Sequence, residues 1–137
     1  MIPEQSAAAP AADQMRLLVI FHYIFAGLAV IGMVFLTGHY WLMNSMMDPA
    51  QWAGDPTPPP EGFLDMFVWF YVVMGVMCVL GLVLNLLVAS SLRQRRRWML
   101  CAVVSGLNCL QMPLGTLLGV FTLVLINRSD VRATFTS

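Results

Sequence analysis

The stretch "CLQMPLGTLLGV", residues 109–120, lies inside a long uncharged segment near the C-terminus and decides how the chain folds there. It contains a proline, a glutamine and two glycines that are four residues apart. Segment 98–127 either forms one helix that is broken at Pro113, or it turns at 111–113 and returns as a second helix. The two interpretations place the C-terminus on opposite sides of any membrane that the segment enters.

The composition indicates an integral membrane protein. The chain has 137 residues, of which 59% are hydrophobic and only 10% are charged, whereas soluble domains carry roughly 25% charged residues. Three windows, 17–47, 66–92 and 98–127, contain no Asp, Glu, Lys or Arg, and each exceeds the ~20 residues that span a bilayer. A chain this short has too little polar surface to cover three such helices. The first window also exceeds the apolar region of a signal peptide, so we expect an uncleaved span.

The distribution of charge predicts the orientation of the chain. Basic residues mark the cytoplasmic side of membrane proteins, and all seven basic residues here are arginines, at positions 16, 93, 95, 96, 97, 128 and 132. The proline-rich segment 48–62 has no basic residue and is predicted to be the outer loop. Residues 1–16 are rich in Ala and Pro, and we expect them to form a flexible cytoplasmic tail. The cluster Arg93, Arg95, Arg96 and Arg97 is predicted to be a cytoplasmic turn beside anionic lipid headgroups.

The same rule favours a hairpin in the last window. A single crossing would place Arg128 and Arg132 outside, whereas a hairpin brings every arginine to one side. Ala102 and Gly106 before the turn, and Gly115 and Gly119 after it, are small residues four apart. Such pairs allow two helices to approach closely in lipid, so we expect these two faces to pack against each other.

The prediction is therefore an all-α integral membrane protein, a four-helix transmembrane bundle whose last two helices form a tight hairpin. Its single helical domain covers 17–135, with spans at about 17–42, 63–92, 97–111 and 114–127 and both termini in the cytoplasm. Three spans with a proline-broken third helix is the alternative. Each half of the hairpin has about 13 residues, or ~20 Å of helix, so full crossing and a re-entrant hairpin both stay open.

Four polar residues in the apolar windows are the candidate intramembrane contacts: His22, Asn85, Asn108 and Gln111. His22 and Asn85 fall at similar depths in antiparallel helices, which predicts an interhelical hydrogen bond between them. Asn108 and Gln111 are expected to satisfy backbone groups that Pro113 frees at the turn. In a single broken helix they would instead lie near mid-membrane and resemble a substrate or ion site.

The sequence contains no phosphate-binding loop, no H-E-x-x-H and no exposed Cys/His cluster. The three cysteines have no C-x-x-C spacing and are interpreted as small buried hydrophobic residues. His22 and His39 are about 25 Å apart along one helix, so they cannot share one haem iron. We therefore predict no catalytic residue, cofactor or metal, and no binding of nucleic acid.

The run "PLGTLLGVFTLVLINRSDVRATF", residues 113–135, resembles the C-terminal signature of a family of small four-span bacterial inner-membrane proteins. That signature has a similar proline, G-T and L-G-aromatic-T-L run followed by an R-x-x-V-R-x-x-F end. The remainder of the chain matches this family in layout. The resemblance implies a bacterial inner membrane and four helices, and it brings no activity or active-site residue.

The function predicted from the sequence is a non-enzymatic membrane protein, an accessory or structural subunit of a membrane complex or a homo-oligomer. Its small-residue faces and the lack of ionisable intramembrane carboxylates favour this function. A small transporter or channel is the alternative, although proton coupling in such proteins typically uses a membrane-embedded carboxylate. A haem-binding electron-transfer subunit, with a methionine as second ligand, is the third.

Overall fold

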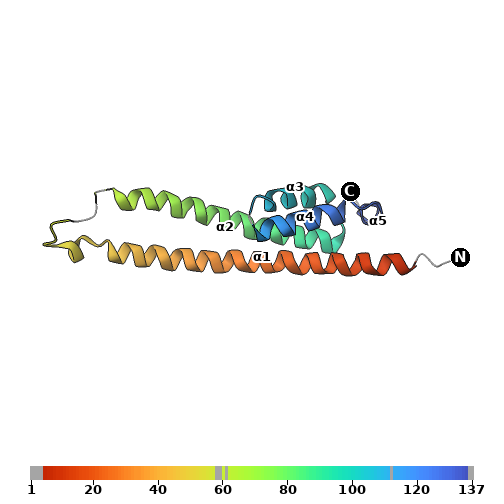
Figure 1. The fold of residues 1–137 in the computed structure, drawn as a ribbon, viewed down its shortest axis with the longest axis horizontal. Coiled ribbons are helices and arrows are strands. Elements are labelled where there is room, and N and C mark those ends of the chain that lie inside the picture. Colours follow the sequence, from red (N-terminus) through yellow and green to blue (C-terminus); the bar gives the residue numbers. More distant parts are fainter. Residues whose placement is uncertain (1–4, 58–59, 61, 112, 136–137) are drawn as a thin grey trace. The chain divides into compact units, whose positions relative to one another are not determined.

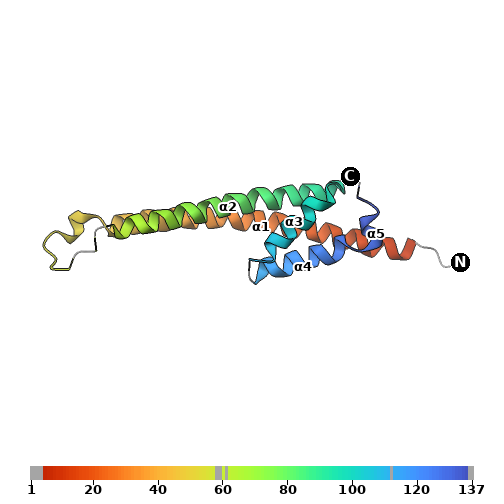
Figure 2. The ribbon, with the colours of Figure 1, turned by 90° about the horizontal axis from the view of Figure 1, so that it is seen from above.

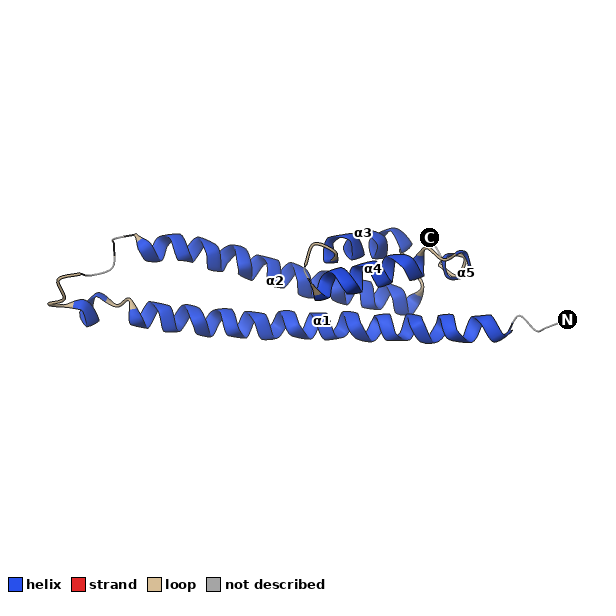
Figure 3. Ribbon diagram, viewed as in Figure 1, coloured by secondary structure: helices blue, strands red, loops and turns tan. Residues whose placement is uncertain are grey.

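The computed structural model describes residues 5–57, 60, 62–111 and 113–135. Every regular element in the described part is helical, which confirms the all-α fold class (Figures 1 and 3). The elements are the α-helices α1 Gln5–Met46, α2 Phe63–Gln94, α3 Trp98–Asn108, α4 Leu114–Ile126 and α5 Ser129–Arg132, and the 3-10 helix η1 Pro49–Trp52.

Helix α1 begins at Gln5, inside the segment predicted to be a tail. Residues 5–16 are therefore helical, the flexible cytoplasmic tail stays a prediction, and residues 1–4 lie outside the described part. Five of the residues between 7 and 12 are alanine, the strongest helix former. Met15 and Leu18 are buried on the same helix face, so packing continues the helix toward its N-terminus.

Two helices are long and apolar enough to cross a membrane: Ala12–Trp52, with a mean hydropathy of 2.4, and Asp65–Gln94, with 2.7. Helices α3 and α4 are also apolar, but they have 11 and 13 residues, about 16 and 20 Å of helix. A bilayer core is about 30 Å thick. Two of the four predicted spans therefore have a helix of sufficient length.

The neighbouring elements do not lengthen the two short helices. A turn at residues 95–97 separates α2 from α3, where Arg95 and Arg97 adopt positive φ angles of 50° and 55°. Helix α4 ends at Ile126, before the separate short helix α5. Backbone with positive φ is disfavoured for residues with a side chain, and it reverses the chain sharply at the arginine cluster.

The chain forms two compact units. Unit 2 is Gly27–Leu82, and unit 1 combines Met1–Ala26 with Val83–Ser137. In unit 2, the hydroxyl of Tyr71 on α2 and Nδ1 of His39 on α1 share a hydrogen bond, and Tyr40 packs edge-on against Tyr71 at 5.2 Å between ring centroids. The described part of the predicted outer loop begins with η1, where the carboxylate of Asp48 accepts a hydrogen bond from the backbone N–H of Ala50.

Unit 1 contains the buried core. Along each helix the buried residues recur every three or four positions, as expected for one face of an α-helix. The apolar core residues are Met15, Leu18, Val88, Leu92, Cys101, Val104, Leu118, Leu125, Ile126 and Val131. Between α3 and α4 the chain reverses direction and the two helices pack side by side (Figure 2).

Candidate functional site

The interior of unit 1 is unusual in holding polar side chains from four helices, while large apolar side chains cover its outside. Helices α1, α2, α3 and α4 each contribute at least one buried polar residue, and these are His22, Asn85, Ser91, Ser105, Asn108 and Thr122. Thr122 donates its hydroxyl to the carbonyl oxygen of Leu118 at 2.7 Å. Three of these side chains define the candidate site. Asn85 and Asn108 join α2 to α3 through a hydrogen bond, and His22 leaves one ring nitrogen without a partner among the described residues.

Asn108 and Asn85 are joined directly. Nδ2 of Asn108 donates to Oδ1 of Asn85 at 3.1 Å, and both residues are buried. The predicted bond between His22 and Asn85 is wrong, because Nδ1 of His22 instead donates to the carbonyl oxygen of Leu18 at 2.9 Å. Two contacts explain the difference. Helix α3 brings the amide of Asn108 to Asn85, and His22 satisfies one ring nitrogen with a carbonyl of its own helix.

Two buried polar atoms have no hydrogen-bond partner among the described residues: Nε2 of His22 and the hydroxyl oxygen of Ser105. Because Nδ1 carries the proton that binds Leu18, Nε2 is an acceptor in the neutral ring. Nowhere among the described residues do three side chains of His, Cys, Asp or Glu come together as a metal site would require. Ser105 likewise leaves a buried hydroxyl oxygen without a partner among the described residues.

The close contact between α3 and α4 depends on Gly115 and Gly119. A methyl group on Gly119 would fall within 3.0 Å of the backbone oxygen of Ser105 and of both the sulfur and the backbone nitrogen of Cys109. On Gly115 it would lie 2.6 Å from the backbone oxygen of Asn108. Neither glycine leaves room for a side chain, so α3 and α4 approach closely there; the predicted role of these glycines in packing within lipid stays a prediction.

The predicted partner face on α3 is wrong. Gly106 is exposed, and a methyl group on it would meet nothing within 4 Å, while Ala102 is only half-buried. The residues that contact the glycines of α4 are instead Ser105, Asn108 and Cys109, of which Ser105 lies one position before Gly106. One position turns a helix by about 100°, so the small residues of α3 point to another side.

Thr116, which the sequence reasoning overlooked, holds the turn together. Its hydroxyl donates to the carbonyl oxygen of Cys109 at 2.8 Å, and its backbone N–H donates to the carbonyl oxygen of Gln111 at 3.2 Å. The predicted role of the Asn108 and Gln111 amides is therefore wrong: Asn108 binds Asn85, and the side chain of Gln111 is exposed. The available signal was a threonine three residues after Pro113, within reach of the preceding carbonyls.

The start of α3 and the end of α4 meet at the arginine-bearing end of unit 1. The indole Nε1 of Trp98 donates to the carbonyl oxygen of Ile126 at 3.0 Å, and the guanidinium of Arg132 lies 4.3 Å above the Trp98 ring. Arg128 forms an ion pair with Asp130 at 3.1 Å. The cluster Arg93, Arg95, Arg96 and Arg97 is exposed, and its contact with lipid headgroups stays a prediction.

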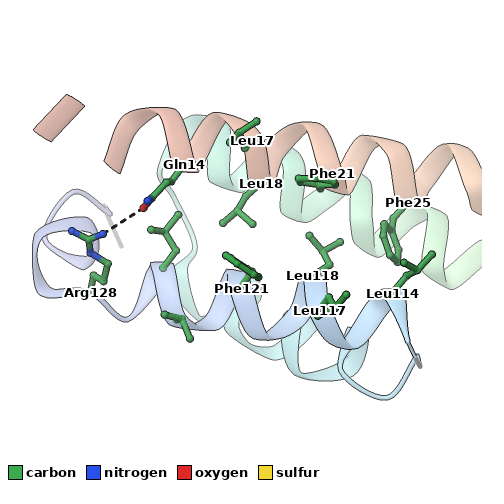
Figure 4. Close-up of a pocket in the computed structure, with 12 residues that line it drawn as sticks. Gln14, Leu17, Leu18, Phe21, Phe25, Leu114, Leu117, Leu118, Phe121 and Arg128 are labelled. Carbon is green, nitrogen blue, oxygen red and sulfur yellow. Dashed lines mark hydrogen bonds between the residues drawn. The ribbon is translucent and has the colours of Figure 1, made fainter. Parts of the chain in front are cut away.

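An apolar groove of about 590 Å³ runs between α1 and α4 within unit 1 (Figure 4). At one end Nη1 of Arg128 donates to Oε1 of Gln14 at 3.4 Å. All the other lining residues are apolar, and the sequence reasoning singled out none of them: Leu17, Leu18, Phe21, Phe25, Leu114, Leu117, Leu118, Phe121, Val124 and Leu125.

No protein-family model, no curated protein and no solved structure matches the chain. The resemblance of residues 113–135 to a bacterial inner-membrane signature therefore stays a prediction.

Proposed function

We propose that α1 and α2 cross a bacterial inner membrane and that the α3–α4 hairpin enters it from the side that carries the arginines. The distribution of residues supports this proposal. A core helix of a soluble protein buries its apolar residues, but only 17% of each apolar window in α1 and α2 is buried. In unit 1 six polar side chains are buried and many large apolar ones are exposed, as lipid favours. The positive-inside rule then places both termini in the cytoplasm.

The hydrogen bond between Asn108 and Asn85 supports a proposal for the depth of the hairpin. Asn85 lies nine residues before Gln94, or about 14 Å from the arginine end of α2, and 22 residues, or about 33 Å, after Phe63. Asn108 is the last residue of α3. In a bilayer core of about 30 Å, the hairpin turn therefore lies near the middle. We infer two full crossings and a re-entrant hairpin, in place of four full crossings.

The functional proposal rests on a turn near the middle of the membrane. Leu110 is 79% exposed, and Gln111 is exposed beside it. Non-helical backbone at membrane depth is tolerated where protein buries it or where it lines water. We propose that protein covers this turn, and that the chain is a non-enzymatic accessory or structural subunit, either of a larger membrane complex or of a homo-oligomer.

A small channel or transporter is the second candidate, and the same turn favours it. If water fills the outer half of the membrane beside the hairpin, Gln111 would line that cavity. The buried acceptor on His22 and the hydroxyl of Ser105 would add polar groups on the inner side. The two candidates differ in one respect, which is whether protein or water covers residue 111.

Thiol labelling distinguishes these candidates. In a variant whose three native cysteines are replaced by alanine, Gln111→Cys is exposed to a membrane-impermeant maleimide in intact membranes and again after detergent extraction. A covered turn predicts no labelling in membranes, labelling after harsh extraction, and a companion or second copy that co-purifies in mild detergent. Trp41→Cys, a 72%-exposed position near the end of α1, is the labelling control. Full labelling in intact membranes together with a clean monomer would contradict the subunit proposal and favour a water-lined cavity.

A further inference from the structure

The groove between α1 and α4 has the polarity and the dimensions of a lipid site. Its volume of about 590 Å³ falls in the range of roughly 300–1,000 Å³ that ligand sites occupy. Its two polar lining residues, Gln14 and Arg128, are hydrogen-bonded to each other at one end (Figure 4). We propose that the groove binds one acyl chain of an anionic phospholipid, with the phosphate against Arg128. This inference rests on the proposed membrane placement.

The groove has the length of one membrane leaflet. Helix α4, from Leu114 to Ile126, has 13 residues, about 20 Å of helix, and Arg128 follows just after its end. Half of a bilayer including its headgroups is about 20–22 Å thick. The proposed orientation places Arg128 at the cytoplasmic headgroups and Leu114 at the bilayer middle, beside the hairpin turn. A lipid of the cytoplasmic leaflet would therefore lie along the groove with its headgroup and its tail each at a matching depth.

The charge at the polar end favours an anionic headgroup. The described residues of unit 1 carry all seven arginines of the chain and two acidic residues, Asp13 and Asp130. Asp130 binds Nε and Nη2 of Arg128 and orients the guanidinium. The Arg128 side chain stays 45% exposed, which leaves it accessible to a phosphate.

The lining favours an acyl chain over a transmembrane helix. Helices associate in lipid through small residues that let their backbones approach. The two glycines of α4 already face α3, and α4 presents long side chains to the groove, among them Leu117 and Phe121, which are 60% and 69% exposed. Long flexible side chains hold backbones apart, and they leave a gap that a single hydrocarbon chain fills.

Lipid retention after reconstitution tests the proposal. The full chain is inserted into vesicles of equal parts phosphatidylglycerol and phosphatidylcholine, extracted in mild detergent, and analysed by mass spectrometry for bound lipid. We expect one retained lipid, with phosphatidylglycerol enriched about fivefold, the preference that one arginine at a membrane surface confers. Arg128→Gln should reduce the enrichment to about one, while Arg16→Gln, an exposed arginine that does not line the groove, should leave it unchanged.

A second pair of variants tests the apolar part. Leu117→Trp narrows the groove and should lower retention of both lipids at least threefold, whereas Leu110→Trp, on the exposed turn outside the groove, should not. Equal lipid ratios in the unaltered protein, or equal effects of Arg128→Gln and Arg16→Gln, would refute the proposal. Dimers that disappear in Leu117→Trp would also refute it, because a second copy would then occupy the groove.

Membrane integration is measured in the same samples, by resistance to carbonate extraction. Failure to integrate would overturn the proposed membrane function, whereas an integrated protein without lipid preference would overturn the lipid site alone. Circular dichroism shows whether each variant keeps its helices. If Leu117→Trp does not fold, the two arginine variants still decide the outcome.

Discussion

At the scale of single residues, Gly119 sets the distance between α3 and α4. Backbone atoms of Ser105 and Cys109 lie where a side chain at this position would be, so closely that no methyl group fits. Atoms of the backbone cannot move aside as the end of a flexible side chain can. The contact is therefore specific to glycine at this position.

Gly119→Ala should destabilise the protein by about 1–3 kcal/mol, the usual cost of forcing an extra methyl group into a packed core. Gly106→Ala is the matched control, because a methyl group there meets nothing within 4 Å and alanine favours the helix. Thermal unfolding in detergent measures both. An equal loss of stability in the two variants would show that α3 and α4 do not pack through Gly119.

Thr116→Val should cost about 1 kcal/mol, the typical net value of one hydrogen bond, because it removes the hydroxyl that binds the carbonyl of Cys109. The control is Thr37→Val, whose hydroxyl binds the carbonyl of Met33 within its own helix and is exposed. Detergent unfolding is again the measurement. A more stable Thr116→Val variant would contradict the role given to this hydroxyl in the turn.

At the scale of elements, the pairing of Asn108 with Asn85 joins the end of α3 to one level of α2. This bond ties the tip of the hairpin to one level on α2. Asparagine in an apolar core has few alternative partners, and an unpaired buried amide is costly. The pair therefore fixes the register of α3 against α2.

A double-mutant cycle with Asn85→Ala and Asn108→Ala should give a coupling of about 0.6 kcal/mol, with an upper bound near 1.7 kcal/mol, the values found for hydrogen bonds between membrane helices. The coupling, rather than either single effect, is the informative quantity, because Asn85 has a further interaction of its own. Unfolding of the four proteins in the same detergent gives it. Strict additivity would mean that the hairpin is held at its depth by other contacts.

The sequence predicted the elements better than their contacts. Uncharged windows and arginines indicated helices at 97–111 and 114–127, and the observed α3 and α4 lie within those ranges. The faces could not be predicted in the same way, because a shift of one residue turns a helix by about 100°. A shift of one residue separates Gly106 from Ser105. The partner of Asn85 was likewise not predictable, because it depends on how close the end of α3 comes to α2.

At the scale of the whole molecule, the arginines are confined to unit 1. Unit 2, from Gly27 to Leu82, contains no arginine, and the exposed surface of unit 1 combines arginines with large apolar side chains. The groove residues were not predictable from the sequence, because each is an ordinary Leu, Phe or Val in an apolar window. Only the packing of α4 beside α1 brings them together.

Fusions at the C-terminus test the orientation of the chain. Both proposed termini lie on the arginine side, so a fluorescent protein after Ser137 should fold and fluoresce, and alkaline phosphatase at the same point should be inactive. Fusions after Asp55, in the predicted outer loop, should give the reverse result. Active phosphatase after Ser137 would mean that segment 98–127 crosses once.

The depth of Leu110 tests the central claim most directly. In the cysteine-free variant, a nitroxide attached at Leu110→Cys reports its depth through collisions with oxygen, which is concentrated in the bilayer, and with a nickel chelate, which stays in water. Leu110 is 79% exposed on the turn, so the label should not disturb packing within the chain. A re-entrant hairpin predicts a depth near the bilayer middle, about 15 Å from either surface of the hydrocarbon core. A label at the outer headgroups would contradict it.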